Sequence, residues 1–235
     1  MPLKHDGIKY PRMTEILSDC TDKSGPLTQW SANMVVEWIR EHCKSNTYTD
    51  TKPYYNLNDE QLDEARFNFR EVSQQALDIG SAVHDAIEVW LKTDKEPTIV
   101  CEQTLAAFVA FIEFADEHKL KPIELEYRLW MKDWCGMLDF YGEFDGSLYV
   151  LDWKSSKGFY RDMRIQVAGY RKAMEDSGFQ VDGHGVVRLD KETGYPEFKD
   201  YSKFYEQDWQ EFEMCKELYL HRHPRIRKQL QEEPC

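Results

Sequence analysis

The chain of 235 residues carries a formal net charge of −13 and has a pI near 5.0, so its average surface repels nucleic acid. This length allows one large domain with a hydrophobic core, or two small ones, and we expect a single domain over residues 1–235. No apolar run approaches membrane-spanning length, and the first residues lack an apolar signal region. These features predict an intracellular, cytoplasmic protein without a membrane partner.

Helical periodicity dominates the first part of the chain, over residues 1–120. Apolar spacing predicts a helix over residues 28–43, a polar loop over 44–57, and a second helix that begins at Asn58 and runs to about residue 77. Gln61 lies three residues after Asn58, which is the spacing of a capping box. Gly80 interrupts the pattern before it resumes over residues 81–91, and another helix is expected over 102–118.

Strand-like patterns follow over residues 121–205, which we expect to hold a sheet and one helix. Three strands are predicted over residues 123–130, 135–144 and 147–154, then a helix over 160–176, then strands over 185–189 and 197–204. A closing helix is expected over residues 206–231. The order predicts an α+β or α/β fold in one unit, with a mixed sheet built on an antiparallel hairpin meander and flanked by helices.

The dipeptide Asp145-Gly146 predicts a two-residue hairpin loop, because both positions of such a loop need positive φ. That loop places Asp139 directly opposite Asp152, with Lys154 on the same face. Two carboxylates so close repel each other, so a compensating charge is expected. The other face is apolar and is expected to face the core, with Leu138, Phe140, Phe144, Tyr149, Leu151 and Trp153. The competing interpretation is an ordinary solvated hairpin face.

A basic strip follows the hairpin. Between residues 154 and 172 the chain has six basic residues and one acid. Such a strip suits phosphate contacts in a single groove, and Lys157, Arg161 and Arg164 are expected to bind DNA there, with Tyr160 as a base-stacking side chain. A solvated helix face is the alternative interpretation.

Four sequence motifs include the two acids of the hairpin or lie to either side of it. They are Gly80-x-x-x-His84, Gly136-x-x-Asp139, Asp152-x-Lys154 and Gln166-x-x-x-Tyr170, and an acid on the first strand, Glu124 or Glu126, would be a fifth. Together they resemble the signatures of the RecB-like, phage-type exonuclease branch of the PD-(D/E)xK nuclease superfamily. The resemblance spans about residues 80–170, and Leu138 stands where the superfamily's name has proline.

The resemblance implies a restriction-endonuclease-like core and a role for each motif residue. His84, Asp139, Asp152 and the backbone carbonyl of Trp153 would bind Mg²⁺ or Mn²⁺. Lys154, Gln166 and Tyr170 would be catalytic or would support catalysis, together with the first-strand acid, for which Glu126 is favoured over Glu124. Hard carboxylate oxygens suit these cations, and one imidazole shifts the preference toward Mn²⁺. His84 alone would more often be a hydrogen-bonded core residue, and the accompanying motifs reverse that preference.

The implied function is a metal-dependent deoxyribonuclease, an exonuclease of phage or prophage type that serves recombination or repair in a bacterial or phage-infected cell. The expected partner is DNA, as an end or a single strand, with a helicase or a single-strand annealing or binding protein as a further partner. The alternative is a non-catalytic DNA-binding or interaction module that retains the fold. Six cysteines lie scattered without C-x-x-C spacing, so free thiols and no iron–sulfur cluster are expected.

Overall fold

The computed structural model describes residues 3–5, 7–21, 24–46 and 54–231. Contacts within the chain divide it into two compact units. The larger unit comprises Met1–Thr21 and Gly80–Cys235, and the smaller comprises Asp22–Ile79. Whether the two units form a single folding domain, as expected from the sequence, stays a prediction. Across the described residues, no helix is both long and apolar enough to span a membrane.

The smaller unit contains α2 (Ser24–His42), the short strands β3 (Ser45–Asn46) and β4 (Tyr54–Tyr55), and the first part of α3 (Asp59–Thr93). The predicted capping box at the start of α3 is confirmed. The amide of Gln61 donates to Asn58 Oδ1 at 2.8 Å, and the amide of Asn58 donates to Gln61 Oε1 at 3.1 Å. The predicted loop over residues 44–57 includes 47–53, which lie outside the described residues.

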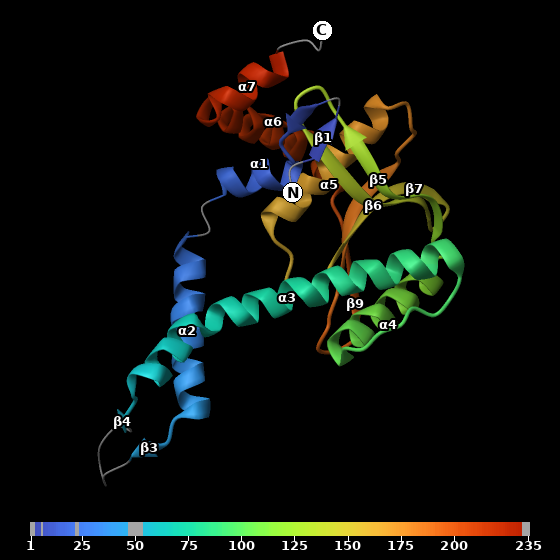
Figure 1. Cartoon of the computed structure of the whole chain (residues 1–235). Coiled ribbons are helices and arrows are strands. Elements are labelled where there is room, and N and C mark those ends of the chain that lie inside the picture. The colour runs from blue at the N-terminus through green and yellow to red at the C-terminus, as the bar shows by residue number, and fades with distance from the viewer. Residues whose placement is uncertain (1–2, 6, 22–23, 47–53, 232–235) are drawn as a thin grey trace. The chain divides into compact units, whose positions relative to one another are not determined.

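The larger unit holds the sheet. Its elements in chain order are β1 (Leu3–His5), β2 (Ile8–Tyr10), α1 (Met13–Cys20), the end of α3, α4 (Glu102–Glu117), β5 (Lys121–Trp130), β6 (Cys135–Phe144), β7 (Ser147–Lys154), α5 (Arg161–Asp176), β8 (Gly183–Leu189), β9 (Pro196–Asp200), the 3-10 turn η1 (Ser202–Phe204), α6 (Tyr205–Arg222) and α7 (Pro224–Gln231). Strands β5 to β9 form one sheet (Figure 1). They are neighbours in that order, and within this sheet only β7 and β8 pair in parallel. The fold is therefore mixed α/β, and its mixed sheet grows from an antiparallel meander, as predicted.

The predicted hairpin between β6 and β7 is confirmed. Asp145 and Gly146 both have positive φ, of 49° and 80°, as a two-residue hairpin loop requires. The ladder pairs Phe144 with Ser147 and continues in the predicted register to Phe140 and Leu151. This register determines which side chains of the two strands can meet farther along the sheet.

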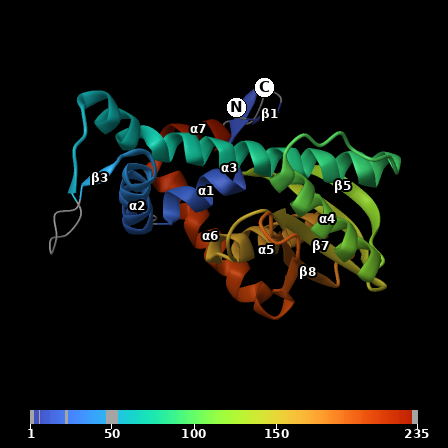
Figure 2. The ribbon, with the colours of Figure 1, turned by 90° about the horizontal axis from the view of Figure 1, so that it is seen from below.

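Aromatic and aliphatic side chains cover both faces of the sheet. On one face, Phe111 of α4 meets the indole of Trp153 edge-on at 5.1 Å, and Phe114 stacks on Phe144 at 5.8 Å. On the other face, α5 covers the strands and α6 packs beside α5 (Figure 2). The buried cluster on this second face includes Tyr141, Val150, Ala173, Met174 and Phe212.

Several element boundaries differ from the prediction, and in three places the element itself changes. Gly80 does not end a helix, because α3 continues from Asp59 to Thr93. The strand predicted over residues 197–204 ends at Asp200, whose Oδ1 accepts the Ser202 amide at 2.7 Å and turns the chain into η1. The closing helix divides at His223, because proline at 224 disfavours a helical conformation in the residue before it.

The continuous α3 leads to a stability prediction. Gly80→Ala should raise the free energy of unfolding by about 0.5–1 kcal/mol, because alanine loses less backbone entropy in a helix interior. The added methyl group has room, since its nearest neighbour, Ser155 Oγ, would be 3.4 Å away. Urea unfolding measures the difference.

The matched control is Gly169→Ala in α5, where the same methyl group would lie 2.1 Å from Met13 Cε. This second variant should be less stable than wild type, because the buried Met13 must move. A Gly80→Ala protein that unfolds at lower urea concentration than wild type would contradict the continuous helix.

Candidate metal centre at the fork of the sheet

Strands β6 and β7 separate at Asp139. Their ladder ends with Phe140 and Leu151, and beyond that point β7 stays paired with β8 while β6 stays paired with β5. The Asp139 carboxylate fills the gap, because its Oδ2 accepts the backbone amide of Trp153 at 2.8 Å. The predicted register is thus correct, but the expected Asp139–Asp152 pair lies one step past the last pair of the ladder, inside a fork.

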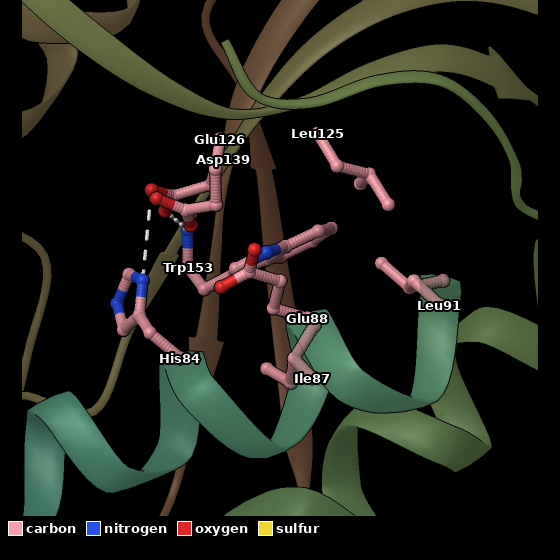
Figure 3. Close-up of a pocket in the computed structure, with 8 residues that line it drawn as sticks. All are labelled: His84, Ile87, Glu88, Leu91, Leu125, Glu126, Asp139 and Trp153. Carbon is pink, nitrogen blue, oxygen red and sulfur yellow. Dashed lines mark hydrogen bonds and ion pairs between the residues drawn. The ribbon is translucent and has the colours of Figure 1, made fainter. Parts of the chain in front are cut away.

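One imidazole and two carboxylates meet in this fork. One ligand atom from each of His84, Glu126 and Asp139 can be chosen so that all three atoms lie within 4.8 Å of one another. His84 Nδ1 is 3.5 Å from Asp139 Oδ1. In Figure 3 the His84 ring points from α3 toward both carboxylates, which come from the facing strands. Asp139 is buried, whereas His84 and Glu126 are partly exposed, so the group is open to solvent on one side.

A local backbone distortion aims Glu126 at the site. Glu126 has a φ of 49° inside β5, a conformation that is uncommon for a residue with a Cβ atom. It reverses the strand's alternation, because Leu125 lines the pocket beside α3 whereas Tyr127 packs against Phe179. Glu124 instead pairs with Tyr141 on β6 and is not in the cluster. Of the two candidate acids, the structure brings Glu126 to His84 and Asp139.

The facing strand β6 shows the same reversal. The sequence predicts Leu138 on the face of Phe140, but Leu138 belongs to the buried cluster of Tyr141 on the opposite face. This expectation is wrong because Asp139 turns into the fork instead of taking a regular strand position. Gly136, on the same strand, leaves room for the ring of Tyr170 on α5, because a Cβ atom at position 136 would lie 2.6 Å from Tyr170 Cε1.

The charges of the cluster shift one another's pKa values. Burial, together with the nearby Asp139 carboxylate, raises the pKa of Glu126 to about 7. Burial lowers the pKa of His84, but the carboxylates of Asp139 and Asp152 outweigh it and raise this pKa to about 9. Burial raises the pKa of Asp139, while His84, Lys154 and the Trp153 amide outweigh it, so that this pKa lies below its usual range.

A second group lies beside the cluster on the α5 side. The Lys154 ammonium is 2.5 Å from Asp152 Oδ2, and Gln166 Nε2 donates to Asp152 Oδ1 at 3.2 Å and to Tyr170 Oη at 3.0 Å. Asp152 is buried, and burial raises its pKa to about 6 although Lys154 opposes the shift. Lys154 therefore supplies the compensating charge that the opposed acids require.

Two expected metal ligands are not part of the three-residue cluster. Asp152 instead contacts Lys154 and Gln166. That Asp152 also binds the metal stays a prediction. Trp153 contributes its amide to Asp139, and the role of its carbonyl stays a prediction too. Glu88, one turn after His84, was not assigned from the sequence. It lines the same pocket and pairs with Lys92, and the helical spacing of four was the signal for it.

The cations of the basic strip pair with acids of the same chain. All six of its cations lie within 4 Å of a carboxylate: Lys154 with Asp152, Lys157 with Glu192, Arg161 with Glu211, Arg164 with Asp208, Arg171 with Glu175, and Lys172 with Asp176. Asp208 is fully buried, so the Arg164 pair holds α5 to α6. Each cation of the strip thus has an acidic neighbour, and the DNA contacts expected of Lys157, Arg161 and Arg164 stay a prediction. Tyr160 is 54 % exposed, as a stacking role would require.

Two sequence comparisons of this chain with known proteins found no match. No protein-family model matches it, and no curated protein sequence matches it significantly. The resemblance to RecB-like nucleases therefore depends on the motif residues alone.

The cluster leads to a prediction about metal binding. Mn²⁺ at 100 times its dissociation constant should stabilise the wild-type protein by about 2.7 kcal/mol, measured as a rise in the unfolding temperature over a sample in EDTA. Glu126→Gln should lose most of that rise, because an amide is a weak ligand for a hard cation. Glu124→Gln is the matched control on the same strand, and it should respond as wild type does. Equal metal responses in the two variants would contradict a cation site at Glu126.

Proposed function

We propose that this chain is a metal-dependent deoxyribonuclease that hydrolyses DNA phosphodiester bonds, an exonuclease of phage type in recombination or repair. The observation that carries the proposal is the convergence at one fork of a His–Glu–Asp cluster and a buried Asp152–Lys154 pair. Carboxylates at such close range can hold a cation that activates water, and a lysine beside them can offset the negative charge of the phosphate that this water attacks.

The origin of the side chains supports the finer fold assignment, a restriction-endonuclease-like core. His84 comes from α3, Glu126 from β5, Asp139 from β6, and the Asp152–Lys154 pair from β7, while α5 returns across the sheet with Gln166 and Tyr170. Each of the five motifs thus has a side chain at the fork or in contact with a residue of the fork. Residues so far apart in the chain need not have met if the motif matches were accidental.

The donor set fits a hard divalent cation. His84, Glu126 and Asp139 would hold it, because two of the three donors are carboxylate oxygens and the third is an imidazole nitrogen. Burial and the neighbouring Asp139 carboxylate raise the pKa of Glu126, and a bound cation would favour its ionised form. When bound, Mg²⁺ or Mn²⁺ supplies an acidified water and neutralises charge on the phosphate.

The chain's own residues place and stabilise the reacting group. Lys154 holds an ammonium at the mouth of the fork, where it can stabilise the negative charge that grows on the phosphate during attack. Asp152 keeps that ammonium in position at 2.5 Å. Gln166 holds Asp152 and is itself tied to Tyr170, so the α5 pair positions the lysine through one shared carboxylate.

End-labelled single- and double-stranded DNA, incubated with Mg²⁺, Mn²⁺ or EDTA, tests the proposal. Wild type should release mononucleotides with either metal and none in EDTA. Lys154→Arg should lower the cleavage rate by about 100-fold or more, because the guanidinium keeps the charge but cannot take the ammonium's position. Lys154→Ala would also leave Asp152 buried without its cation, at a cost of about 3–5 kcal/mol of stability, so arginine is the better substitution.

The control variant is Lys95→Ala, which removes an exposed lysine just after the end of α3 and outside the motifs, and which should cleave as wild type does. A folded Lys154→Arg protein with near wild-type turnover would remove Lys154 from the mechanism. Absence of metal-dependent cleavage in wild type would contradict the nuclease, and a non-catalytic DNA-binding module would then be the better description.

A further inference from the structure

Two lysines near the fork lie against aromatic rings. The ammonium of Lys199, on β9, is 4.2 Å from the ring centre of Phe159, which lies between β7 and α5. The ammonium of Lys203, in η1, is 4.9 Å from the ring centre of Phe204. Both lysines are exposed. An aromatic ring attracts a cation through its quadrupole and carries no net charge, so it orients the ammonium without neutralising it.

The two lysine–ring pairs belong to one surface. Phe159 and Tyr201 both pack against the buried cluster of Met163, Val167 and Val186. Arg164, on the same helix as Met163, has its guanidinium 4.5 Å from the ring centre of Phe204. Gln166, which donates to Asp152 at the fork, lies on the same stretch of α5, so the surface adjoins the fork.

These lysines differ electrostatically from the basic strip. Within the described part of the chain, neither Lys199 nor Lys203 has a carboxylate within 4 Å, whereas all six strip cations do. The acids beside Lys199 in sequence have partners of their own. Glu197 pairs with Arg188, and Asp200 accepts the Ser202 amide and the Tyr149 hydroxyl. The two ammonium groups are therefore available to an anion from solution.

We infer that Lys199, Lys203, Phe159, Phe204 and the exposed Tyr160 form a binding surface for a single DNA strand. Phosphates would contact the two ammonium groups, and one base would stack on the Tyr160 ring. A single strand fits better than a duplex, because a duplex hides its base faces from an aromatic side chain. This inference rests on the proposed nuclease function, for which it supplies the path of the strand toward the fork.

Fluorescence anisotropy with a labelled oligothymidine, in EDTA so that no cleavage occurs, measures the binding of the full chain over a range of salt concentrations. The Lys199→Ala/Lys203→Ala protein should show a salt slope smaller by about 0.7 for each lysine. Each phosphate that a lysine no longer contacts keeps its counterions when the DNA binds. The dissociation constant of this variant should rise about tenfold or more. Lys95→Ala/Lys132→Ala removes the same charge from other exposed positions and should keep the wild-type slope.

Tyr160 separates stacking from charge. Tyr160→Ala should weaken oligothymidine binding by about fivefold to 100-fold with an unchanged salt slope, and Tyr160→Phe should bind as wild type does, because base–aromatic stacking needs only the ring. A labelled duplex with blunt ends serves as the comparison ligand. The duplex should bind more weakly than the single strand, and the Tyr160 variants should not differ on it.

The inference is overturned if wild type does not bind the oligothymidine, or if the Lys199→Ala/Lys203→Ala and control proteins share one slope. It is also overturned if Arg161→Ala lowers the slope while the lysine variant does not. Failure of the nuclease proposal gives another pattern. In that case metal-dependent cleavage is absent from wild type, while lysine-dependent binding in EDTA persists.

Discussion

The hydrogen bond from the Trp153 amide to the Asp139 carboxylate ends the pairing of β6 with β7 and opens the fork in which the site lies. A buried backbone amide must find an acceptor, and here a side chain provides it. The acceptor is a carboxylate whose pKa is lowered first by His84, then by Lys154, and to a smaller extent by this bond, so it stays ionised inside the protein. The strands can then separate without leaving the Trp153 amide unpaired, and both faces of the gap become available to α3 and α5.

Charge compensation is the second constraint on this site. Asp139 and Asp152 are both buried beside the fork, and the protein balances them with Lys154 and His84 instead of with solvent. The same pairing of charges extends along α5, where each cation lies within 4 Å of a carboxylate. An acidic protein of this kind retains few cations for a polyanionic substrate, which is why the lysines held by Phe159 and Phe204 are of interest.

Much of the architecture could be predicted because local signals determine it. Asp145-Gly146 determines the hairpin and its register, and Asn58 with Gln61 determines the start of α3. Strict alternation could not separate Glu124 from Glu126, since the positive φ that distinguishes them is a tertiary effect. The pairing of the basic strip was also beyond sequence reasoning, because Arg161 and Glu211 lie 50 residues apart and meet only once α5 and α6 pack together. That the segments carrying the five motifs meet was predicted from the motifs, whereas how Asp152 is shared between Lys154 and Gln166 required the structure.

The most direct measurement of the central claim is X-ray diffraction from crystals grown with Mn²⁺, at a wavelength where manganese scatters anomalously. The fork should contain one anomalous peak, with carboxylate oxygens of Glu126 and Asp139 and a ring nitrogen of His84 at about 2.0–2.6 Å, the range of hard cations in oxygen-rich sites. The same crystals of Glu126→Gln should lose the peak or show it strongly weakened. A wild-type map with no peak in the fork, or with manganese held only by other residues, would contradict a metal centre built on the Asp139 fork.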